Sequence, residues 1–476
     1  MNRLITQILD RFSEIGITMY LVGGAVRDII MNKVPKDLDF TTHLDNAGVK
    51  YYLTEDGVGD WYDGIYKINK QHLTQVVRYK DDDGNLHDLE ITQFRIDAQT
   101  DGRHAQCIGT TSIKKDLERR DFTINAIAYS HETKSYIDPF KGEQDIKNKI
   151  LRCVGNPWDR FQEDELRVLR LFRFEARLGA DWTIEQDTLD AAMAYKMENI
   201  SMERIRDEIS KVFGDPNADC ELFLDRLYEH GVLKRCLPQL WASDKNGNTV
   251  FCDKLIQTPK HHPEGDVWTH IKMVVQAATG VWGRWIALLH DIAKPCTAEW
   301  DALGKGNQWY SFHGHDRVGA EIIPDIVKHL RLEKQLGKIA AVCTRWHMDI
   351  YKFCNNVGKK DGGKVITGPK AKRVREVQSD FAKHNVPLHY MEDLAKADHM
   401  GRPLVEGVDE FWTPLPKEQT KRALSGYDVM AADNTVKPGL ELKEMLDAAY
   451  RYQLKHGITD TVELLSVALN YKKEGK

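Results

Sequence analysis

The segment from Tyr20 to Thr42, YLVGGAVRDIIMNKVPKDLDFTT, constrains the fold of this 476-residue chain more than any other stretch. An apolar triplet, two glycines and a run of helix-compatible residues predict a strand, a tight turn and a helix in direct succession. Gly23 and Gly24 permit a tight turn and a close approach of the backbone to a ligand. The free N–H groups at the start of the helix would lie beside this turn, which is an arrangement that suits a phosphate.

Two aspartates follow the helix at strand spacing. Pro35 interrupts the chain, and the next residues, from Asp37 to Phe40, predict the start of a strand. Side chains two positions apart on a strand share a face, so Asp37 and Asp39 would point the same way. An isolated pair of this kind is usually a solvated strand face. Beside a phosphate-binding turn, however, two neighbouring carboxylates suit Mg²⁺.

The combined pattern G-G-x-V-R-D and D-x-D resembles the active-site signature of the polymerase-β-type nucleotidyltransferases. More narrowly, it resembles the branch that contains the tRNA CCA-adding enzymes and the bacterial poly(A) polymerases. The resemblance implies a metal-dependent nucleotidyl transfer. The residues that it implies are catalytic Asp37 and Asp39 with Mg²⁺, and Gly23, Gly24 and Arg27 around the triphosphate of the nucleotide.

A third carboxylate is expected from the β-rich region that follows. Strands are predicted over residues 65–68, 73–79 and 89–94, with a hairpin turn at 81–85. The segment HDLEITQFR is similar to the family's E-V-T-T-F-R strand, which makes Glu90 the expected third catalytic carboxylate. The alternative for Glu90 is a solvated strand face.

The stretch 97–115 has no clear period and is predicted to be a flexible loop. It is followed by DLERRDFTINAIAY at 116–129, in which an apolar run with helical composition follows the Arg-Arg-Asp triplet. This segment resembles the second motif of the family, which is linked to recognition of the ribose and triphosphate. The resemblance assigns Arg120 and Asp121 to nucleotide binding. Guanidinium groups suit phosphate oxygens, and a carboxylate can accept from a ribose hydroxyl.

Residues 147–215 predict a helical neck, in which EDELR occupies the place of the family's E-D-x-x-R motif. Asp164, Arg167 and Arg170 share one predicted helix face, and in a generic helix they would form an i,i+3 ion pair. In the family motif, an Asp acceptor beside an Arg donor matches the amino and ring-nitrogen edges of cytosine and adenine. Uracil and guanine present the reverse order. Asp164 and Arg167 are therefore expected to select CTP and ATP, with Arg170 beside them.

A second amphipathic helix is predicted at 201–213, SMERIRDEISKVF. It resembles the family's E-R-I-R-x-E element, which implies that Glu203 and Arg206 support the helix that selects the base.

A second constellation begins near residue 260. Histidines and aspartates recur on segments of helical periodicity, in an H…HD…H…H…D order that resembles the HD-domain phosphohydrolases. Imidazole with carboxylate suits Ni²⁺, Mn²⁺ or Zn²⁺, and Mg²⁺ is a further possibility. His261, His262 and His313 are expected in flanking turns, outside the ligand set. The expected metal ligands are His270, His290, Asp291 and Asp398, with His315 and His347 for a second ion.

Composition bears on the cellular compartment of the chain and on its binding partners. No apolar run is long enough to cross a membrane, and the first residues do not resemble a signal peptide. The eight cysteines form no C-x-x-C pair, which favours reduced thiols and a cytoplasmic location. A net charge of −5 argues against indiscriminate coating of nucleic acid, although a local basic patch can still hold RNA. The chain could be a monomer or a homodimer.

The sequence thus predicts an α+β fold, with a small mixed-sheet nucleotidyltransferase head followed by an all-α neck, HD body and tail. The two family resemblances imply the tRNA 3′ end, CTP and ATP as partners. They also imply CCA addition as the activity, joined to an HD phosphatase or 2′,3′-cyclic phosphodiesterase. A poly(A) polymerase or a partial CC- or A-adding enzyme remains open, as does an HD phosphohydrolase with an inactive head. A non-catalytic RNA-binding module is disfavoured by the two complete ligand sets. The expected domains are 1–146, 147–215, 216–400 and 401–476.

Overall fold

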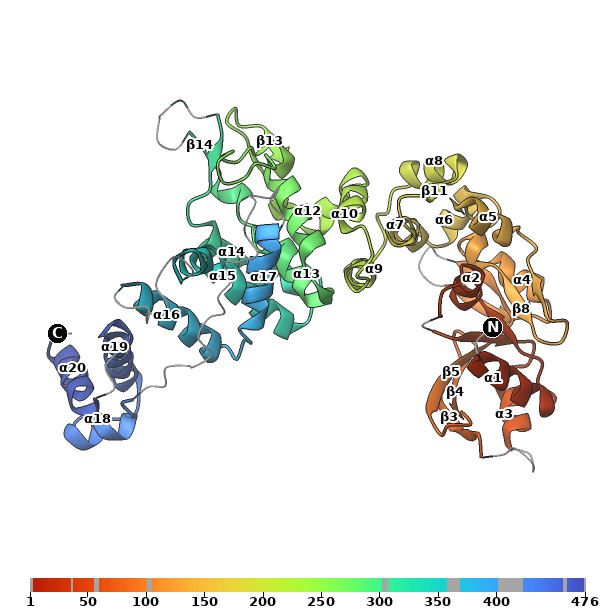
Figure 1. Ribbon diagram of the computed structural model, residues 1–476, viewed down its shortest axis with the longest axis horizontal. Helices are drawn as coiled ribbons and strands as arrows, with labels where there is room; N and C mark the ends of the chain where they lie inside the picture. Colours follow the sequence, from red (N-terminus) through yellow and green to blue (C-terminus); the bar gives the residue numbers. More distant parts are fainter. Residues whose placement is uncertain are drawn as a thin grey trace. The chain divides into compact units, whose positions relative to one another are not determined.

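A computed structural model describes residues 3–35, 37–54, 60–100, 105–301, 306, 308–357, 369–400, 423–456 and 460–474. The chain divides into two compact units, Met1–Val232 and Leu233–Lys476. Figure 1 labels the elements of both. The predicted α+β class, with a mixed sheet in an N-terminal head, is confirmed.

The first unit is built on a seven-stranded sheet in the order β3-β4-β5-β2-β1-β8-β9. Its neighbouring strands are antiparallel except β2 and β5, which run parallel. In Figure 1, β3, β4 and β5 lie side by side. The strands are β1 (Tyr20–Val22), β2 (Asp39–Thr42), β3 (Tyr62–Asn69), β4 (Thr74–Lys80), β5 (Leu86–Gln93), β8 (Ala128–Ser130) and β9 (Ser135–Ile137).

One face of this sheet is packed and the other carries polar side chains. The helix α1 (Arg3–Glu14) buries its apolar stripe, and its Phe12 contacts Trp61, which in turn contacts Tyr79 of β4. Along β2 the buried Phe40 alternates with the exposed Asp39. The period of two therefore directs the acidic side chain away from the core.

The predicted strand, turn and helix at the start of the head are confirmed. Gly23 follows β1 directly and has a φ of 69°, which lies in the positive-φ region that glycine adopts readily. The helix α2 (Gly24–Ile30) starts at the next residue. A Cβ at position 23 would lie 2.8 Å from Nη1 of Arg120, so the absent side chain also leaves room for that guanidinium. Strand β2 begins at Asp39, so Asp37 lies just before the strand and not inside it.

Two expectations for residues 97–129 are wrong. The stretch predicted to be a flexible loop contains the hairpin of β6 (Arg95–Thr100) and β7 (Ala105–Gly109), followed by α4 (Ile113–Glu118). Residues 101–104 lie outside the described part of the chain. The apolar run after the Arg-Arg-Asp triplet forms a 3₁₀ turn, η1 (Thr123–Asn125), and then β8. Pairing of β8 with β1 overrides the helical composition of this run.

Helices complete the first unit, and the predicted neck helices at 164–177 and 201–213 are confirmed as α7 and α9, which pack together. Short strands β10 (Ile150–Leu151) and β11 (Thr183–Ile184) pair beside them. The remaining helices are α3 (Asn46–Thr54), α5 (Gly142–Asn148), α6 (Pro157–Glu163), α7 (Leu166–Leu178), α8 (Gln186–Ala194), α9 (Met202–Phe213) and α10 (Cys220–Glu229).

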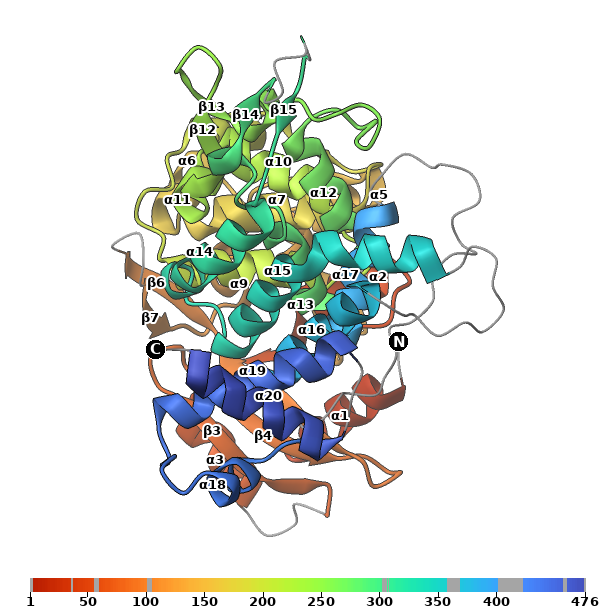
Figure 2. The same ribbon diagram turned by 90° about the vertical axis from the view of Figure 1, so that its left-hand side faces the viewer.

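The second unit is mainly helical, as expected, with two short hairpins, β12 (Trp241–Ser243) with β13 (Thr249–Phe251) and β14 (Glu299–Trp300) with β15 (Tyr310–Ser311). Its α14 and α15 pack together and are seen from another side in Figure 2. Short elements are α11 (Val232–Cys236), which spans the division between the units, and the 3₁₀ turns η2 (Pro238–Leu240), η3 (Cys252–Lys254) and η4 (Pro295–Thr297). The longer helices are α12 (Val267–Ala277), α13 (Gly280–Leu289), α14 (His315–His329), α15 (Lys334–Val357), α16 (Pro369–Lys383) and α17 (His389–Met400).

The last described helices, α18 (Gly426–Ala432), α19 (Leu440–His456) and α20 (Thr461–Glu474), share an apolar cluster that includes Val429, Met445 and Leu464. The basic stretch 355–377 is helical at both described ends, because α15 continues to Val357 and α16 begins at Pro369. Residues 358–368 lie outside the described part. Among the described helices, none is both long enough and apolar enough to span a bilayer.

Candidate active sites

A cavity of about 590 Å³ opens on the polar face of the head sheet. It is bounded by the Gly23–Gly24 turn, by β2 and β5, and by residues of α7. All the predicted nucleotide-site residues except Asp37 line it. These are Gly23, Gly24, Arg27, Asp39, Glu90, Arg120, Asp121, Asp164, Arg167 and Arg170.

The acidic groups of the head meet at this cavity. Asp39 of β2 is directly opposite Glu90 of β5 in the parallel pair, so their side chains are neighbours on one face. Partial burial raises the pKa of Asp39, and the negative charges of Glu90 and Asp37 raise it further, while Arg120 lowers it. Carboxylate repulsion strong enough to raise a pKa identifies a position where a cation would be stabilised. An oxygen-only donor set of this kind fits a hard divalent ion.

The Arg-Arg-Asp motif joins the sheet to the helix α7. Nη2 of Arg120 lies 3.3 Å from Asp116. Asp121 is 7% exposed and accepts hydrogen bonds from Nε and Nη2 of Arg170, at 2.8 and 2.5 Å. Although burial opposes it, the charge of Arg170 holds the pKa of Asp121 well below its usual range. Asp121 is therefore an ionised anchor for Arg170.

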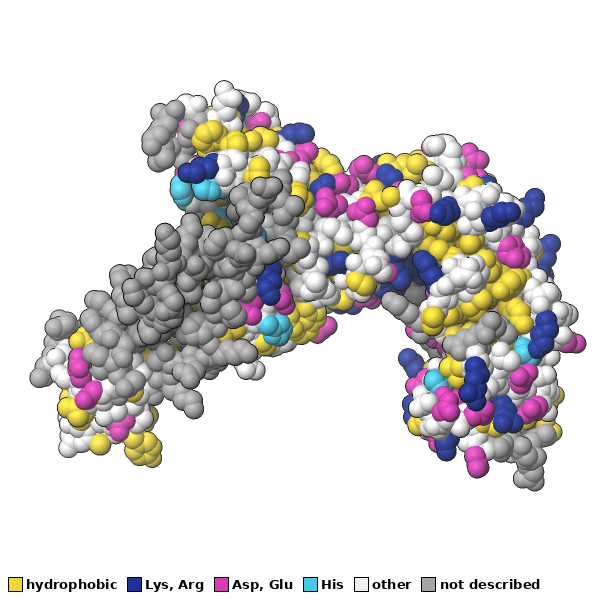
Figure 3. Space-filling model, viewed as in Figure 1, with side chains coloured by type: hydrophobic (Ala, Val, Ile, Leu, Met, Phe, Trp, Pro, Cys, Tyr) yellow, Lys and Arg dark blue, Asp and Glu magenta, His cyan; other side chains and the backbone are white. Residues whose placement is uncertain are grey.

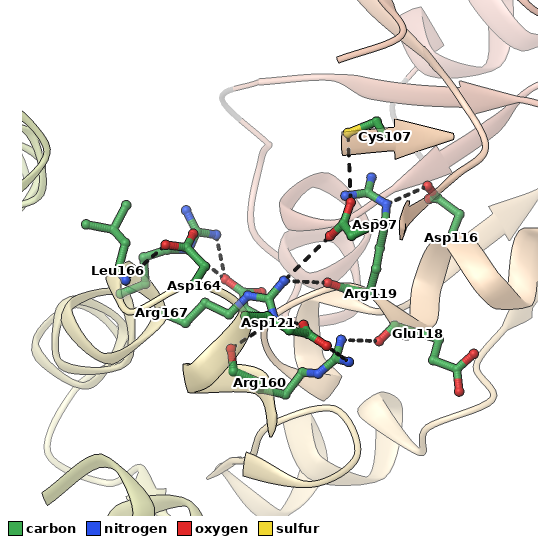
Figure 4. A network of polar contacts seen from close by, with 12 residues as sticks. Asp97, Cys107, Asp116, Glu118, Arg119, Asp121, Arg160, Asp164, Leu166 and Arg167 are labelled. Atoms are coloured by element: carbon green, nitrogen blue, oxygen red, sulfur yellow. Dashed lines mark hydrogen bonds and ion pairs between the residues drawn. The ribbon is translucent and has the colours of Figure 1, made fainter. Parts of the chain in front are cut away.

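The predicted base-selecting pair lies at the edge of the cavity, in the network shown in Figure 4. Asp164 precedes α7, and both of its carboxylate oxygens lie 3.0 Å from Nη2 of Arg204. Arg167 is 9% exposed and donates to the carbonyl oxygens of Arg119 and Arg160 and to Glu163. Asp164 and Arg167 are therefore held by these other partners, and not by the i,i+3 ion pair expected in a generic helix.

Residues that the sequence did not single out support this arrangement. On α9, Arg204 binds Asp164, and Glu208 forms a buried ion pair with Arg173 of α7 at 2.7 Å. Helix α9 therefore supports α7, as expected, but through these two side chains. Arg206, which was expected in that role, forms an ion pair with the adjacent Asp207. The sequence signal that could have identified them is the spacing of Arg204 and Glu208, which lie four residues apart and therefore on one face of α9.

The cavity is strongly basic. Among the described residues that line it, nine are arginines and four are acidic. On the face of the molecule in Figure 3, by contrast, positive and negative side chains are interspersed. Because the chain as a whole carries a charge of −5, the positive charge is gathered in the cavity, where it suits a triphosphate.

The second unit brings all six predicted HD-type residues together in its interior. Asp291 lies at the centre, with Nε2 atoms of four histidines within 3.4 Å of its oxygens. Asp398 completes one side, 3.2 Å from Nε2 of His270. Three groups in the described chain could hold a metal ion, one of which, His262, Glu264 and His270, shares His270 with a second. The other two contain the predicted HD-type residues. They are His270, His290 and Asp398, and Asp291, His315 and His347.

The histidine rings are oriented by their other nitrogen. Nδ1 of His290, His315 and His347 each lies within 2.7 Å of a backbone carbonyl oxygen three residues earlier. This contact fixes the proton on Nδ1 and leaves Nε2 as an electron-pair donor toward the centre. Nε2 of His290 and Oδ1 of Asp291 are buried with no hydrogen-bond partner in the described structure. Such orphaned atoms fit one or two divalent cations between them.

Two residues of this cluster were missed from the sequence. Glu264 lies 2.8 Å from Nδ1 of both His262 and His270, and these contacts hold the pKa of Glu264 at about 2 despite its burial. His262 was expected only in a flanking turn. Lys294 is buried, with Nζ 2.6 Å from Asp291 and 2.7 Å from Gln257. Because Lys294 follows Asp291 by three residues, about one helical turn, the sequence could have indicated that the two side chains are neighbours.

Three known protein-family models match separate stretches of the chain. Residues 19–152 match the poly A polymerase head domain, residues 181–244 match the probable RNA- and SrmB-binding site of polymerase A, and residues 268–377 match the HD domain. The two enzymatic domain types imply divalent metals, in agreement with the carboxylate and histidine groups described above. The chain therefore contains three stretches that match, in order, the poly A polymerase head domain, the probable RNA- and SrmB-binding site of polymerase A and the HD domain.

Within that class, the relatives are CCA-adding enzymes, and the predicted resemblance is confirmed. The chain is 38% identical to the CCA-adding enzyme of Streptococcus uberis over 44% of its length and 49% of that protein. It is 29% identical to the multifunctional CCA protein of Aliivibrio salmonicida over 70% of its length and 76% of that protein. The chain thus spans about half of the first relative and about three quarters of the second.

A solved structure shares the fold. The CCA-adding enzyme of Bacillus stearothermophilus, solved in complex with CTP, matches with a TM-score of 0.61 and 22% identity. The match covers 99% of this chain and 98% of that one.

Proposed function

We propose that this chain adds the nucleotides of the CCA sequence to the 3′ end of tRNA, using CTP and ATP. The observation that carries the proposal is the pairing of Asp39 with Glu90 beside the Gly23 turn, in a cavity lined by nine arginines. Carboxylates for a divalent cation, adjacent to a phosphate cradle, are the two requirements of nucleotidyl transfer.

The roles follow from the geometry of the cavity. Arg120, and the backbone at Gly23 and Gly24, bind the triphosphate, because the missing Cβ of Gly23 lets that guanidinium approach. Arg27 is held by Asp28 and Asn125 at the same wall. Asp37 and Asp39, with Glu90 beside them, would hold Mg²⁺. When bound, it lowers the pKa of the attacking 3′-hydroxyl and neutralises charge on the α-phosphate.

Selection of the base is assigned to Asp164 and Arg167. The carboxylate of Asp164 provides the acceptor for the amino group of cytosine or adenine, and the contact with Arg204 orients it. Arg167 lies at the same wall as the donor for the ring nitrogen. Asp121 acts by fixing Arg170, which contributes positive charge toward the nucleotide.

The primary test is an extension assay with tRNA lacking its 3′ CCA, with CTP and ATP offered separately and together. Addition of C, C and A in order supports the proposal. Long A tracts, or addition that stops after CC or requires a preformed CC end, would assign a poly(A) polymerase or a partial enzyme instead. Asp39→Asn should abolish extension, and an unchanged rate in this variant would contradict the site.

Base selection has its own test. Asp164→Ala should raise incorporation of UTP and GTP relative to CTP and ATP, because the site loses the acceptor that favours an amino group. Asp207→Ala, which removes an exposed carboxylate on α9, is the matched control. If nucleotide preference is the same in both variants, Asp164 does not select the base.

We further propose that the second unit hydrolyses phosphoesters, as a phosphatase or a 2′,3′-cyclic phosphodiesterase. The favouring observation is the convergence of histidines on Asp291, with Nε2 of His290 and Oδ1 of Asp291 buried without a partner in the described structure. Ni²⁺, Mn²⁺, Zn²⁺ or Mg²⁺ held there would activate water. Asp291→Ala should abolish hydrolysis of 2′,3′-cyclic AMP and p-nitrophenyl phosphate while extension of tRNA continues. Loss of both activities would contradict separate sites.

A further inference from the structure

A second cavity, of about 370 Å³, lies on the same face of the head sheet as the nucleotide cavity. It is lined by residues of β3, of the turn after it, and of β4, and it shares Glu90 and Arg95 with the nucleotide cavity. The two cavities therefore adjoin at Glu90. Neither the proposed nucleotide contacts nor the HD cluster uses the residues that belong to the second cavity alone.

The register of the strands aligns this second cavity with the catalytic carboxylates. Asp39 is opposite Glu90, Glu90 is opposite Val76, and Val76 is opposite Lys67. These residues form one row across the sheet on one face. Two strand spacings place Lys67 roughly 10 Å from Glu90.

A second row, two residues along the strands, is also polar. Thr92 is opposite Thr74, and their hydroxyl groups lie 3.0 Å apart, while Asn69 is opposite Thr74 on the other side. The floor of the second cavity is thus made of hydroxyl and amide groups beside a carboxylate. This lining suits a polar ligand and not an apolar one.

The charges around the second cavity favour an anion. Glu90 is its one acidic lining residue in the described chain, against Lys67, Arg95 and the titratable His72. Arg95 donates through Nη1 to the carbonyl of His72, but its Nε is buried without a partner in the described structure. Two cationic side chains, Lys67 and Arg95, beside an open cavity suit a ligand with anionic oxygens.

The order of the strands indicates which of the two anionic substrates, the triphosphate or the RNA strand, the second cavity would bind. In the sheet, β1 and the Gly23 turn lie on one side of β2, whereas β5, β4 and β3 lie on the other. Phosphoryl transfer places the attacking and leaving oxygens in line, on opposite sides of the reacting phosphorus. Since the triphosphate is assigned to the Gly23 side, the attacking hydroxyl must approach from the side of β5 and β4.

We propose that this cavity, the acceptor groove lined by Lys67, Asn69, His72, Thr74 and Arg95, binds the last nucleotides of the RNA strand that is extended. Lys67 and Arg95 contact backbone phosphates, and the terminal 3′-hydroxyl lies at Glu90 and Asp39. The separation of Lys67 from Glu90 is comparable to the last one or two nucleotides of the strand. This inference rests on the proposed nucleotidyl transfer and assigns its second substrate to a place in the head.

The first test is the Kd of the full chain for a CCA-less tRNA, measured by fluorescence anisotropy without nucleotide, in the wild type, Lys67→Ala and Lys67→Glu. Lys50→Ala is the matched control, because Lys50 is exposed on α3 and lines neither cavity. We expect Kd to rise about threefold to tenfold in Lys67→Ala, and further in Lys67→Glu. Loss of one phosphate contact to a single strand should lower the slope of log K against log salt by about 0.7.

The second test is kinetic. In Lys67→Ala the KM for RNA should rise while the KM for CTP stays within the range of Lys50→Ala. If Lys67→Ala leaves the Kd for RNA unchanged, or raises the KM for CTP as much as the KM for RNA, the assignment of the acceptor groove to RNA is wrong. If the wild type binds the RNA but extends it with no nucleotide, the proposed activity fails, and the effect of Lys67→Ala on Kd still tests the groove.

Cross-linking gives a third readout that does not depend on turnover. RNA carrying a 3′-terminal 4-thiouridine should cross-link to peptides from residues 62–80 and 86–95. Cross-links confined to other segments would place the RNA end elsewhere and refute the assignment. If the wild type binds no RNA, both the groove and the proposed activity are wrong.

Discussion

The ion pair between Asp121 and Arg170 is predicted to hold α7, which carries the proposed base-selecting Arg167, against the sheet of the head. Asp121 accepts from the backbone N–H of Phe122, from Nδ2 of Asn125 and twice from Arg170. The change Asp121→Asn keeps the shape but replaces one accepting oxygen with a donor. At least one of these donors then faces another donor, and the buried part of the Arg170 charge loses its partner.

The magnitude follows from burial. Removing one partner of a fully buried pair costs about 3–5 kcal/mol, through the charge that is left. The side chain of Asp121 is 7% exposed but that of Arg170 is 32% exposed, so water solvates part of the remaining charge. We expect a loss of about 2–3 kcal/mol, at or just below the lower end of that range. For the 232 residues of the first unit, this corresponds to a fall in Tm of about 4–12 °C.

The assay is thermal unfolding of the full chain at pH 7, with hydrogen exchange of peptides from 113–178 to assign the transition. Asp207→Asn, which removes the same charge from a side chain that is 53% exposed, is the control and should shift Tm by less than about 2 °C. The pKa of Asp121 is depressed, so its stabilisation is full above the ordinary Asp pKa and is lost as pH falls through the folded-state value. The variant should therefore lose less stability in acid than the wild type. Equal Tm values for the two variants at pH 7 would refute the anchoring role.

Three further predictions concern the turn, the second unit and pH. Gly23→Ala should lower kcat/KM for CTP at least tenfold, because its Cβ would lie 2.8 Å from Arg120, whereas Gly155→Ala, with a similar φ of 71° and nothing within 4 Å, should lower stability alone. MnCl₂ at one hundred times its Kd should stabilise the second unit by about 2.7 kcal/mol, and Asp291→Ala should abolish this shift in thermal unfolding. Burial lowers the pKa of His230 from 6.5 to about 4, so the unfolded chain takes up this proton first as pH falls. The first unit should therefore lose stability from this group between pH 7 and pH 5, and His230→Leu should show a flatter dependence of Tm on pH.

The placement of the acidic residues could be predicted from the sequence to an informative degree. The period of two holds within β2, where Asp39 is exposed and Phe40 is buried, but Asp37 precedes the strand and is not among the described residues that line the cavity. The contact of Asp39 with Glu90 depends on the pairing of β2 with β5, across a separation of 51 residues. No local pattern contains a register of that kind, and only the resemblance of HDLEITQFR to a family strand pointed to Glu90.

Local composition misled where tertiary pairing decided the structure. The hairpin of β6 and β7 was missed because its strands are short and a bulge breaks their alternation between Asp97 and Gln99. The segment after Asp121 has helical composition but pairs with β1, since the sheet needs a strand there. Propensity is a weak preference that burial in a sheet readily outweighs.

The HD-type residues were predicted as a set, because each lies on a segment with helical periodicity. A histidine or aspartate is unusual on the apolar face of such a segment. Glu264 and Lys294 were not predicted, since a Glu in a turn and a Lys on a helix are ordinary features of a surface. Both become informative only after folding, when Glu264 contacts His270 and Lys294 contacts Asp291 in the interior. The orienting residues of a buried polar site are thus harder to read than its ligands.

The arginines of the head cavity are not equivalent, and their partners show where the positive charge is free to act. Arg170, Arg173 and Arg204 each face a carboxylate, at Asp121, Glu208 and Asp164 respectively.

By contrast, Arg119 and Arg120 share the single carboxylate of Asp116. Arg95 keeps a buried Nε without a partner in the described structure. The excess charge is therefore concentrated around Arg95 and Arg120, next to Glu90 and Asp39, and not spread along α7. Phosphates on either side of the reacting centre would be drawn to these two guanidiniums, which is the charge distribution that an in-line transfer between two polyanionic substrates requires.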